Sequence, residues 1–290
     1  MDPRRPLGLI ATVTAVLALA ACGSSDKTKT AAAPAAATTA GAGSCARGQL
    51  KTFADGKLTI ATDKPAYPPY FVDDDPTNGK GFESATAYAI AKRLGYSPAQ
   101  VSWKVVPFNS SYAPGAKKFD FDVNQVSIND KRKKAVDFSA PYFSAPQAII
   151  TPKGSKLKVT SLADLKGTQF GVQVGTTSLD AVTSTIAPSK QPKVFDDSNA
   201  VVQALKNAQV DAVVVDLPTA FYLTGAEVQG AKIVGQFKAP GGDDWGALLQ
   251  KGSPLTACVT KAVEGLRSSG GLQRIYDRWL GDAAGAPELR

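Results

Sequence analysis

The stretch QFGVQVGTTSLDAVTSTIAPSKQPKVFDDSNAVVQALKNAQVDAVVVD (169–216) begins and ends with a short apolar run. The two runs, QFGVQV (169–174) and VDAVVV (210–215), are valine-containing and have the length of buried strands. Helices are predicted between them, near residues 178–186 and 199–208. Strands that alternate with helices in this order predict an α/β fold with a largely parallel sheet.

The same alternation occurs on the N-terminal side of this stretch. KLTIATD (57–63) has Leu58 and Ile60 on one face, as a half-buried strand does, and a helix is predicted from Glu83 to Gly95. The two β-α-β runs, 57–128 and 169–215, predict two similar lobes. The other predicted strands are 101–106, 119–128, 147–151 and 232–237, and further helices are predicted from Ser253 onward and over 272–280.

Residues that follow each predicted strand are candidate site residues, because ligands of α/β sheets bind beyond the carboxyl ends of strands. The turn 175–178 also opens a helix, whose free N–H groups favour an anion. The candidates found in this way are Asp63, the loop Tyr67-Pro68-Pro69-Tyr70, Phe108, the cationic run 131–134, the turn Gly175-Thr176-Thr177-Ser178, and Asp216.

The N-terminus has the features of a secretory signal. Arg4 and Arg5 precede the apolar run LGLIATVTAVLALA, which leads into small residues and Cys22. This pattern resembles a bacterial lipobox, in which the cysteine is acylated and becomes the first residue of the mature chain. The sequence therefore predicts a signal peptide over 1–21 and lipidation of Cys22; the alternative is an ordinary signal peptide that contains a cysteine.

Residues 22–45 are predicted to be the acylated cysteine and a flexible tether. Their Ala-, Thr-, Gly- and Ser-rich composition has no large apolar side chain to bury, and such a chain spans roughly 25 Å. Beyond the tether, no segment approaches the ~20 continuous apolar residues of a membrane span, which excludes a channel or a permease. The predicted location is outside the cytoplasm, anchored by lipid at the outer face of the cytoplasmic membrane, at the cell surface or in the periplasm.

Composition excludes several classes of function. The chain of 290 residues contains no histidine, so catalytic mechanisms built on imidazole are excluded and a metal site is not expected. The net charge is +8, and it is near +7 without residues 1–21, which contain two arginines and one aspartate. The lysines are scattered and no basic-aromatic platform is present, so nucleic-acid binding is not expected. No cofactor is predicted.

Three cysteines are present, and Cys22 is assigned to the anchor. The remaining pair, Cys45 and Cys258, lies in a chain predicted to enter an oxidising compartment. A disulfide between them is predicted, which ties the start of the folded body to a helix near the C-terminus. Two unrelated thiols are the alternative.

Several motifs together resemble one known family. The order TD, YPPY, GFE, SINDKRKKAVDFSAPYF, SLADLKG, VGTTS, VDAVVVD and YDRWLG is similar to the polar-amino-acid solute-binding proteins of ABC importers. The similarity extends from about Lys57 to Gly281. It implies a two-lobed periplasmic-binding-protein fold of the Venus-flytrap type, with two hinge-crossing strands and an amino acid captured between the lobes.

The resemblance also implies roles for individual residues. A planar guanidinium at the ligand α-carboxylate, assisted by hydroxyls, and an aspartate at the α-ammonium suit a zwitterion. Since the two charges come from different lobes, the ligand is expected to favour a closed state. The implied contacts are Arg132, Ser127, Thr176 and Thr177 at the carboxylate, Asp216 at the ammonium, Tyr67 and Phe108 around the ligand side chain, and Asp63 near its tip.

Two departures from the family pattern affect the site. Amide side chains at Asn124 and Gln125 replace small residues, so Gln125 is expected to fill or reshape the pocket. Glu83 replaces the commoner aspartate after Gly-Phe and is interpreted as structural.

Two alternative functions stay open: an enzyme on the same fold, such as a cyclohexadienyl or arogenate dehydratase, and a ligand-sensing lipoprotein.

The expected division of the body places lobe 1 at 46–145 plus 246–290 and lobe 2 at 146–245. The crossings are predicted near 143–148 and 242–247.

The expected partners are a small amino acid, the permease of an ABC importer and, through the lipid anchor, the membrane. The protein is expected to be a monomer.

Overall fold

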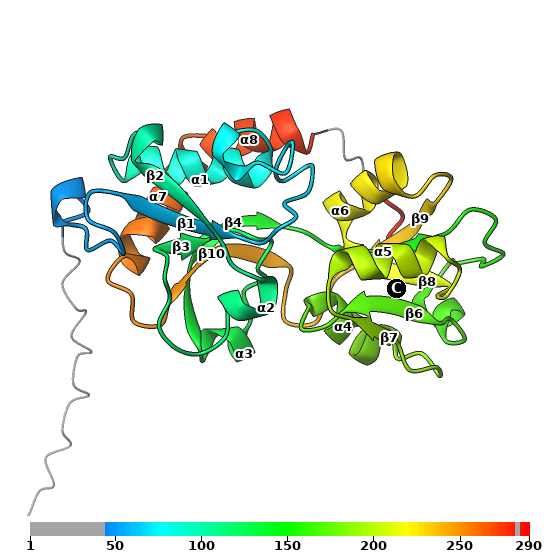
Figure 1. Ribbon diagram of the computed structural model, residues 1–290. Coiled ribbons are helices and arrows are strands. Elements are labelled where there is room, and N and C mark those ends of the chain that lie inside the picture. The colour runs from blue at the N-terminus through cyan, green and yellow to red at the C-terminus, as the bar shows by residue number, and fades with distance from the viewer. Residues whose placement is uncertain (1–43, 282–284) are drawn as a thin grey trace, which may run out of the picture. The chain divides into compact units, whose positions relative to one another are not determined.

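Two five-stranded sheets, each flanked by helices, make up the part of the chain that the structure, a computed structural model, describes: residues 44–281 and 285–290 (Figure 1). The strand order is β2-β1-β3-β10-β4 in one sheet and β7-β6-β8-β5-β9 in the other. We call each sheet with its helices a lobe. The mixed α/β fold with two lobes agrees with the expectation from the sequence.

The first lobe combines parallel and antiparallel pairing. Strand β1 (Leu58–Thr62) is parallel to β2 (Val101–Val105) and β3 (Phe121–Asp122), whereas β10 (Asp244–Gln250) is antiparallel to β3 and to β4 (Val136–Ser144). The helices of this lobe are α1 (Phe82–Arg93), α2 (Phe108–Ser111), α3 (Asp130–Lys133), α7 (Thr256–Ser268) and α8 (Gly271–Trp279).

The second lobe repeats this arrangement. Strand β6 (Phe170–Gln173) is parallel to β7 (Lys193–Phe195) and β8 (Ala212–Asp216), and β5 (Gln147–Thr151) is antiparallel to β8 and to β9 (Lys232–Phe237). Its α-helices are α4 (Thr177–Ala181), α5 (Ser198–Lys206) and α6 (Leu217–Tyr222). Short helical turns elsewhere are Arg47–Gln49, Pro76–Asn78, Pro98–Gln100, Leu162–Leu165, Val182–Ile186 and Leu223–Glu227.

The sheets are less parallel than predicted. The chain passes from β4 directly into β5, and from β9 into β10 through residues 238–243, and the strands around these passages pair antiparallel. The second passage overlaps the predicted crossing, 242–247, at residues 242–243. The strand predicted over 119–128 is interrupted: β3 covers two residues, Gln125 adopts a left-handed backbone with φ 49°, and Ser127 beyond it forms a separate bridge with Trp245.

A disulfide joins Cys45 to Cys258, with 5.5 Å between the Cα atoms, which confirms the predicted pair. Cys258 lies on α7 and is buried in the core of the first lobe. The bond therefore fastens the beginning of the folded body to its last but one helix. Cys22, the predicted signal peptide and most of the predicted tether lie outside the described residues. Among the described residues, no helix has the length and apolar character needed to cross a membrane.

The last residues of the chain belong to the second lobe, although the predicted boundary placed all of 246–290 in the first. Glu288 pairs with Gln236 on β9, and Leu289 is buried in the core beside β6. A Cβ atom on Gly235 would lie 2.4 Å from Leu289 Cγ, so glycine at this position of β9 leaves the room that the leucine fills.

Leu289→Ala is expected to destabilise the protein by about 2–4 kcal/mol, since it leaves a cavity in the core of the second lobe. Urea unfolding of the two proteins measures this difference. Arg290→Ala is the matched control, because the Arg290 side chain is 91% exposed. An equal effect of both substitutions would contradict the packing role of Leu289.

Candidate functional site

A cavity lies between the two lobes and takes its lining from the carboxyl ends of their strands. The empty space among its lining residues amounts to about 1320 Å³, part of which is open solvent. All the residues that the sequence predicted as ligand contacts line it: Asp63, Tyr67, Phe108, Gln125, Ser127, Arg132, Thr176, Thr177 and Asp216. The structure therefore brings the whole set together, from two lobes, in one cavity.

Arg132 lies in the short helix α3, whose first turn is capped by the Asn129 side chain accepting from Arg132 N. Its side chain is buried, and Nη1 donates to Ser127 O at 2.7 Å while Nη2 donates to Gly175 O of the second lobe at 3.0 Å. The Tyr112 ring lies 4.6 Å from the guanidinium carbon. These contacts fix the plane of a group with five N–H donors, more than the two carbonyls use.

Hydroxyl groups surround this guanidinium. Ser127 Oγ and Thr177 Oγ1, from different lobes, lie 3.2 Å apart, and both residues are buried. Thr176 is the cap of α4: its Oγ1 accepts from Leu179 N and donates to Gln173 O. The Thr176 hydroxyl is thus used locally, so the hydroxyl pair of Ser127 and Thr177 is better placed to meet a ligand.

Asp216 is the last residue of β8, and its carboxylate faces the same cavity. Its Oδ1 accepts a hydrogen bond of 2.6 Å from Gln147 Nε2. Burial raises the pKa of Asp216 to about 7, the negative charge of Asp243 acts in the same direction, and the bond from Gln147 and the charge of Arg132 oppose it. A cation beside Asp216 would favour its charged form.

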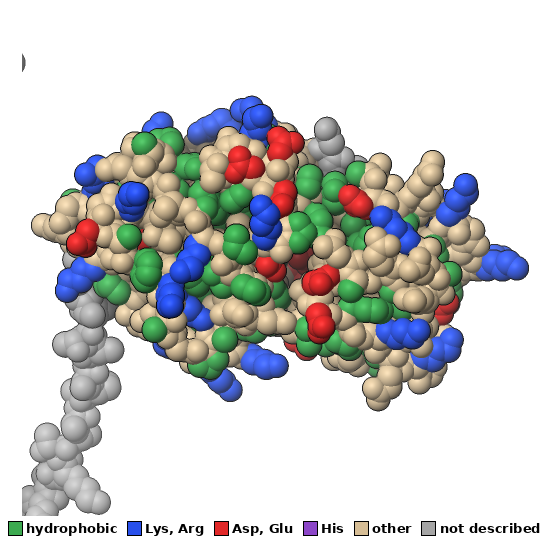
Figure 2. Space-filling view, viewed as in Figure 1, with side chains coloured by type: hydrophobic (Ala, Val, Ile, Leu, Met, Phe, Trp, Pro, Cys, Tyr) green, Lys and Arg blue, Asp and Glu red, His purple; other side chains and the backbone are tan. Residues whose placement is uncertain are grey.

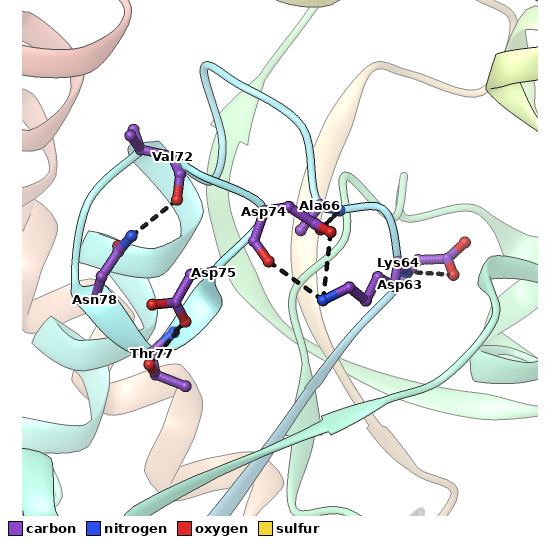
Figure 3. A network of polar contacts seen from close by, with 8 residues as sticks. All are labelled: Asp63, Lys64, Ala66, Val72, Asp74, Asp75, Thr77 and Asn78. Atoms are coloured by element: carbon purple, nitrogen blue, oxygen red, sulfur yellow. Dashed lines mark hydrogen bonds and ion pairs between the residues drawn. The ribbon is translucent and has the colours of Figure 1, made fainter.

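The loop after β1 is held in place by its own polar contacts (Figure 3). Lys64 Nζ lies 3.3 Å from Asp74 Oδ2, and Asp74 Oδ1 accepts from Ala66 N. Asp63 accepts from Lys64 N and, through Oδ2, from Phe108 N at 3.0 Å. Asp63 therefore joins the loop to α2 as well as lining the cavity.

The two predicted aromatic residues contact different neighbours. The Tyr67 hydroxyl donates to Asn199 Oδ1 of the second lobe, and its ring lies 6.5 Å from that of Tyr222. Burial, followed by the charges of nearby carboxylates, raises the pKa of Tyr67 to about 12. The Phe108 ring lies 5.4 Å from that of Tyr112 at the arginine end of the cavity. The two rings therefore belong to different regions of the lining.

Gln125 is fixed by Glu83, which was predicted to have a structural role. The fully buried Glu83 carboxylate accepts from Gln125 N at 2.7 Å, from Gln125 Nε2 and from the Tyr142 hydroxyl at 2.5 Å. Burial raises the pKa of Glu83 to about 7 against these hydrogen bonds. Glu83 therefore holds the left-handed turn at Gln125 from behind the cavity wall, as a structural role requires.

Other lining residues were not predicted as ligand contacts. Tyr70, which belongs to the candidate loop but was given no ligand contact by the family resemblance, lines the cavity and forms a 2.8 Å hydrogen bond with Thr219 of the second lobe. Asn199 and Thr219 follow β7 and β8, so the strand-end rule could have found them. Tyr222 and Glu227 lie farther along the chain, around the end of α6, where no local sequence pattern marks them as lining residues.

The sequence pattern of the bacterial extracellular solute-binding proteins, family 3, matches residues 58–282. The chain belongs to this family. The matched region contains every cavity residue described above.

Named relatives of this family-3 protein are similar over most of its length. The L-cystine-binding protein TcyJ of Escherichia coli (strain K12) is 30% identical over 244 residues, which cover 80% of this chain and 89% of that protein. The arginine-binding extracellular protein ArtP of Bacillus subtilis (strain 168) is 27% identical over 279 residues, covering 94% and 96%.

A solved structure, an ancestral arginine-binding protein bound to glutamine, is 36% identical with a TM-score of 0.66, and the match covers 79% of this chain and all of that one. It supports the two-lobed fold. Because these relatives are named as binding proteins, the prediction of a binding protein rather than an enzyme is confirmed.

Proposed function

We propose that the protein captures one free amino acid between its lobes and delivers it to the permease of an ABC importer. The observation that carries the proposal is the presence of Arg132 and Asp216 in one cavity, a cation from the first lobe and a carboxylate from the second. A zwitterion needs opposite charges at its two head groups. The names of relatives that bind cystine, arginine or glutamine support an amino acid as the ligand.

Ligand binding is coupled in this proposal to closure of the lobes. Direct hydrogen bonds already join them, from Arg132 to Gly175 and between Tyr70 and Thr219. A ligand that pairs its carboxylate with Arg132 and its ammonium with Asp216 adds two further links across the cavity. The ligand therefore stabilises the closed state over an open one, which a permease can distinguish.

Thermal unfolding of the full chain in detergent, with each common amino acid in turn, tests the proposal. A ligand at 100 times its dissociation constant adds about 2.7 kcal/mol to the free energy of unfolding. The expected result is an increase of several degrees in Tm for one or a few amino acids. No increase with any amino acid would overturn the proposal.

The proposal includes a lipid anchor at Cys22, at the outer face of the cytoplasmic membrane. Its support is the sequence: two arginines, an apolar run and small residues before the cysteine. Labelled fatty acid fed to the producing cells should be incorporated into the wild-type chain and not into Cys22→Ser. Equal labelling of both chains, or of neither, would contradict the anchor.

The affinity for an amino acid is expected to fall as the pH is lowered through 7. The pKa of Asp216 is about 7 in the free protein, and the ligand ammonium pairs only with its charged form. The ligand therefore binds less well where Asp216 is protonated, by on the order of tenfold between pH 8 and 5.5. Calorimetric titrations across this range measure it. Asp216→Asn should bind weakly with a flatter pH profile; an unchanged profile would contradict the assignment.

A further inference from the structure

The two ends of the cavity differ in character. Arg132, Ser127 and Thr177 form one end, and Asp216 lies close enough to Arg132 for their charges to interact. The other end combines aromatic and acidic groups from both lobes. We call it the acidic end; it consists of Tyr67, Asp197, Asn199, Tyr222 and Glu227.

Carboxylates outnumber cations in the lining. The acidic lining residues are Asp63, Asp197, Asp216 and Glu227, and the basic ones in the described part of the chain are Lys64 and Arg132. Lys64 is occupied by its ion pair with Asp74. Glu227 is likewise paired with Lys206, so once a zwitterion pairs with Arg132 and Asp216, the lining charges outside any ion pair are the negative charges of Asp63 and Asp197.

This excess is opposite in sign to the whole chain, which has a net charge of +8. On the face shown in Figure 2, Asp and Glu side chains gather around the hollow where the lobes meet, while most Lys and Arg side chains lie farther out. A negative region in a basic protein raises the local concentration of cations at the cavity rather than of anions.

The carboxylates of the acidic end are oriented by their own hydrogen bonds. Asp197 caps α5 by accepting from Ala200 N at 2.9 Å. Glu227 accepts from the Tyr222 hydroxyl at 2.7 Å, and its other oxygen lies 3.4 Å from Lys206 Nζ. Each carboxylate has acceptor capacity beyond these contacts, since a carboxylate offers about four lone-pair positions.

A pair of aromatic rings also suits a cationic group. The ring centroids of Tyr67 and Tyr222 lie 6.5 Å apart, and the faces of such rings attract cations.

We propose that the cavity selects amino acids whose side chain carries a positive charge, an ammonium or a guanidinium, with that charge at the acidic end. The inference rests on the proposed function, since it assumes that the ligand head groups pair with Arg132 and Asp216. The ligand then runs along the cavity from Arg132 toward Tyr222 and Glu227.

Arginine and citrulline provide a matched pair of probes, because citrulline has the same chain length and a neutral urea in place of the guanidinium. Calorimetric titration of the full chain should give at least tenfold tighter binding of arginine. Asp197→Asn and Glu227→Gln should each weaken arginine binding more than citrulline binding, so that the preference falls several-fold. Asparagine retains the helix cap at position 197, so this variant should keep its fold.

Glu264→Gln is the control for net charge, since Glu264 is exposed on α7 and does not line the cavity. It should leave the preference unchanged. Equal or tighter binding of citrulline, or a preference that survives both acidic-end substitutions, would overturn cationic selection. If neutral amino acids bind in an Arg132-dependent manner, the proposed function stands without this inference. If no amino acid binds, both are overturned.

Discussion

Arg132→Ala is expected to weaken amino-acid binding by at least about 100-fold. The substitution removes a charge-assisted, forked contact to the ligand carboxylate in a buried site, and truncating one partner of such a pair costs about 2–5 kcal/mol. It also removes the bond from Nη2 to Gly175, which links the two lobes directly. Both losses act in the same direction, because the ligand and this bond stabilise the same closed arrangement.

Arg132→Lys separates charge from geometry. Lysine retains the positive charge but not the planar fork, so a loss of about tenfold is expected, intermediate between wild type and Arg132→Ala. Lys131→Ala is the neighbouring control: its side chain is exposed and does not line the cavity. Calorimetric titration measures all three variants. Unchanged affinity in Arg132→Ala, with the fold intact by circular dichroism, would remove Arg132 from the site.

Loss of the Cys45–Cys258 disulfide is expected to lower the free energy of unfolding by about 3–5 kcal/mol, or Tm by roughly 10 °C. The bond joins residues 213 positions apart, so breaking it releases a very large loop in the unfolded chain. The double substitution Cys45→Ser, Cys258→Ser and reduction of the wild type should give similar shifts in thermal unfolding.

Ligand affinity should change little in the same variants. Both cysteines belong to the first lobe, and neither lines the cavity. The disulfide therefore does not link the two lobes and should not restrict their movement relative to each other. A Tm change below about 2 °C would show that the rest of the first lobe already provides this constraint. A large loss of affinity in the folded double variant would show instead that the bond shapes the cavity.

The lining of the candidate site was predictable in part because its polar residues follow strand ends. Asp63 directly follows the strand β1, and Asp216 is the last residue of β8. Parallel strands bring their carboxyl ends to one edge of a sheet, where such residues gather. The fold class was predictable for the same reason, since β1, α1 and β9 have clear local patterns. The residue roles needed the family resemblance, because a cationic run such as 131–134 is usually a solvated surface.

The remainder depends on contacts between distant residues. The interruption of the predicted strand 119–128 includes Gln125, whose left-handed backbone is held by Glu83, 42 positions earlier. Strand β4 contains Pro141, which obscures a strand pattern, and its pairing with β10 comes from more than 100 residues away. The acidic end likewise requires the two lobes to meet, which no local pattern encodes.

The docking of residues 285–290 on β9 places the carboxyl terminus on the second lobe, whereas Cys45 holds the start of the folded body on the first. The two ends of the folded body are therefore attached to different lobes. The proposed lipid tether at the amino end would restrain the first lobe only, so the second lobe would stay free to move. Fluorophores attached at Ser44 and Arg290 would convert each change in the angle between the halves into a change in energy transfer, without a label near the cavity.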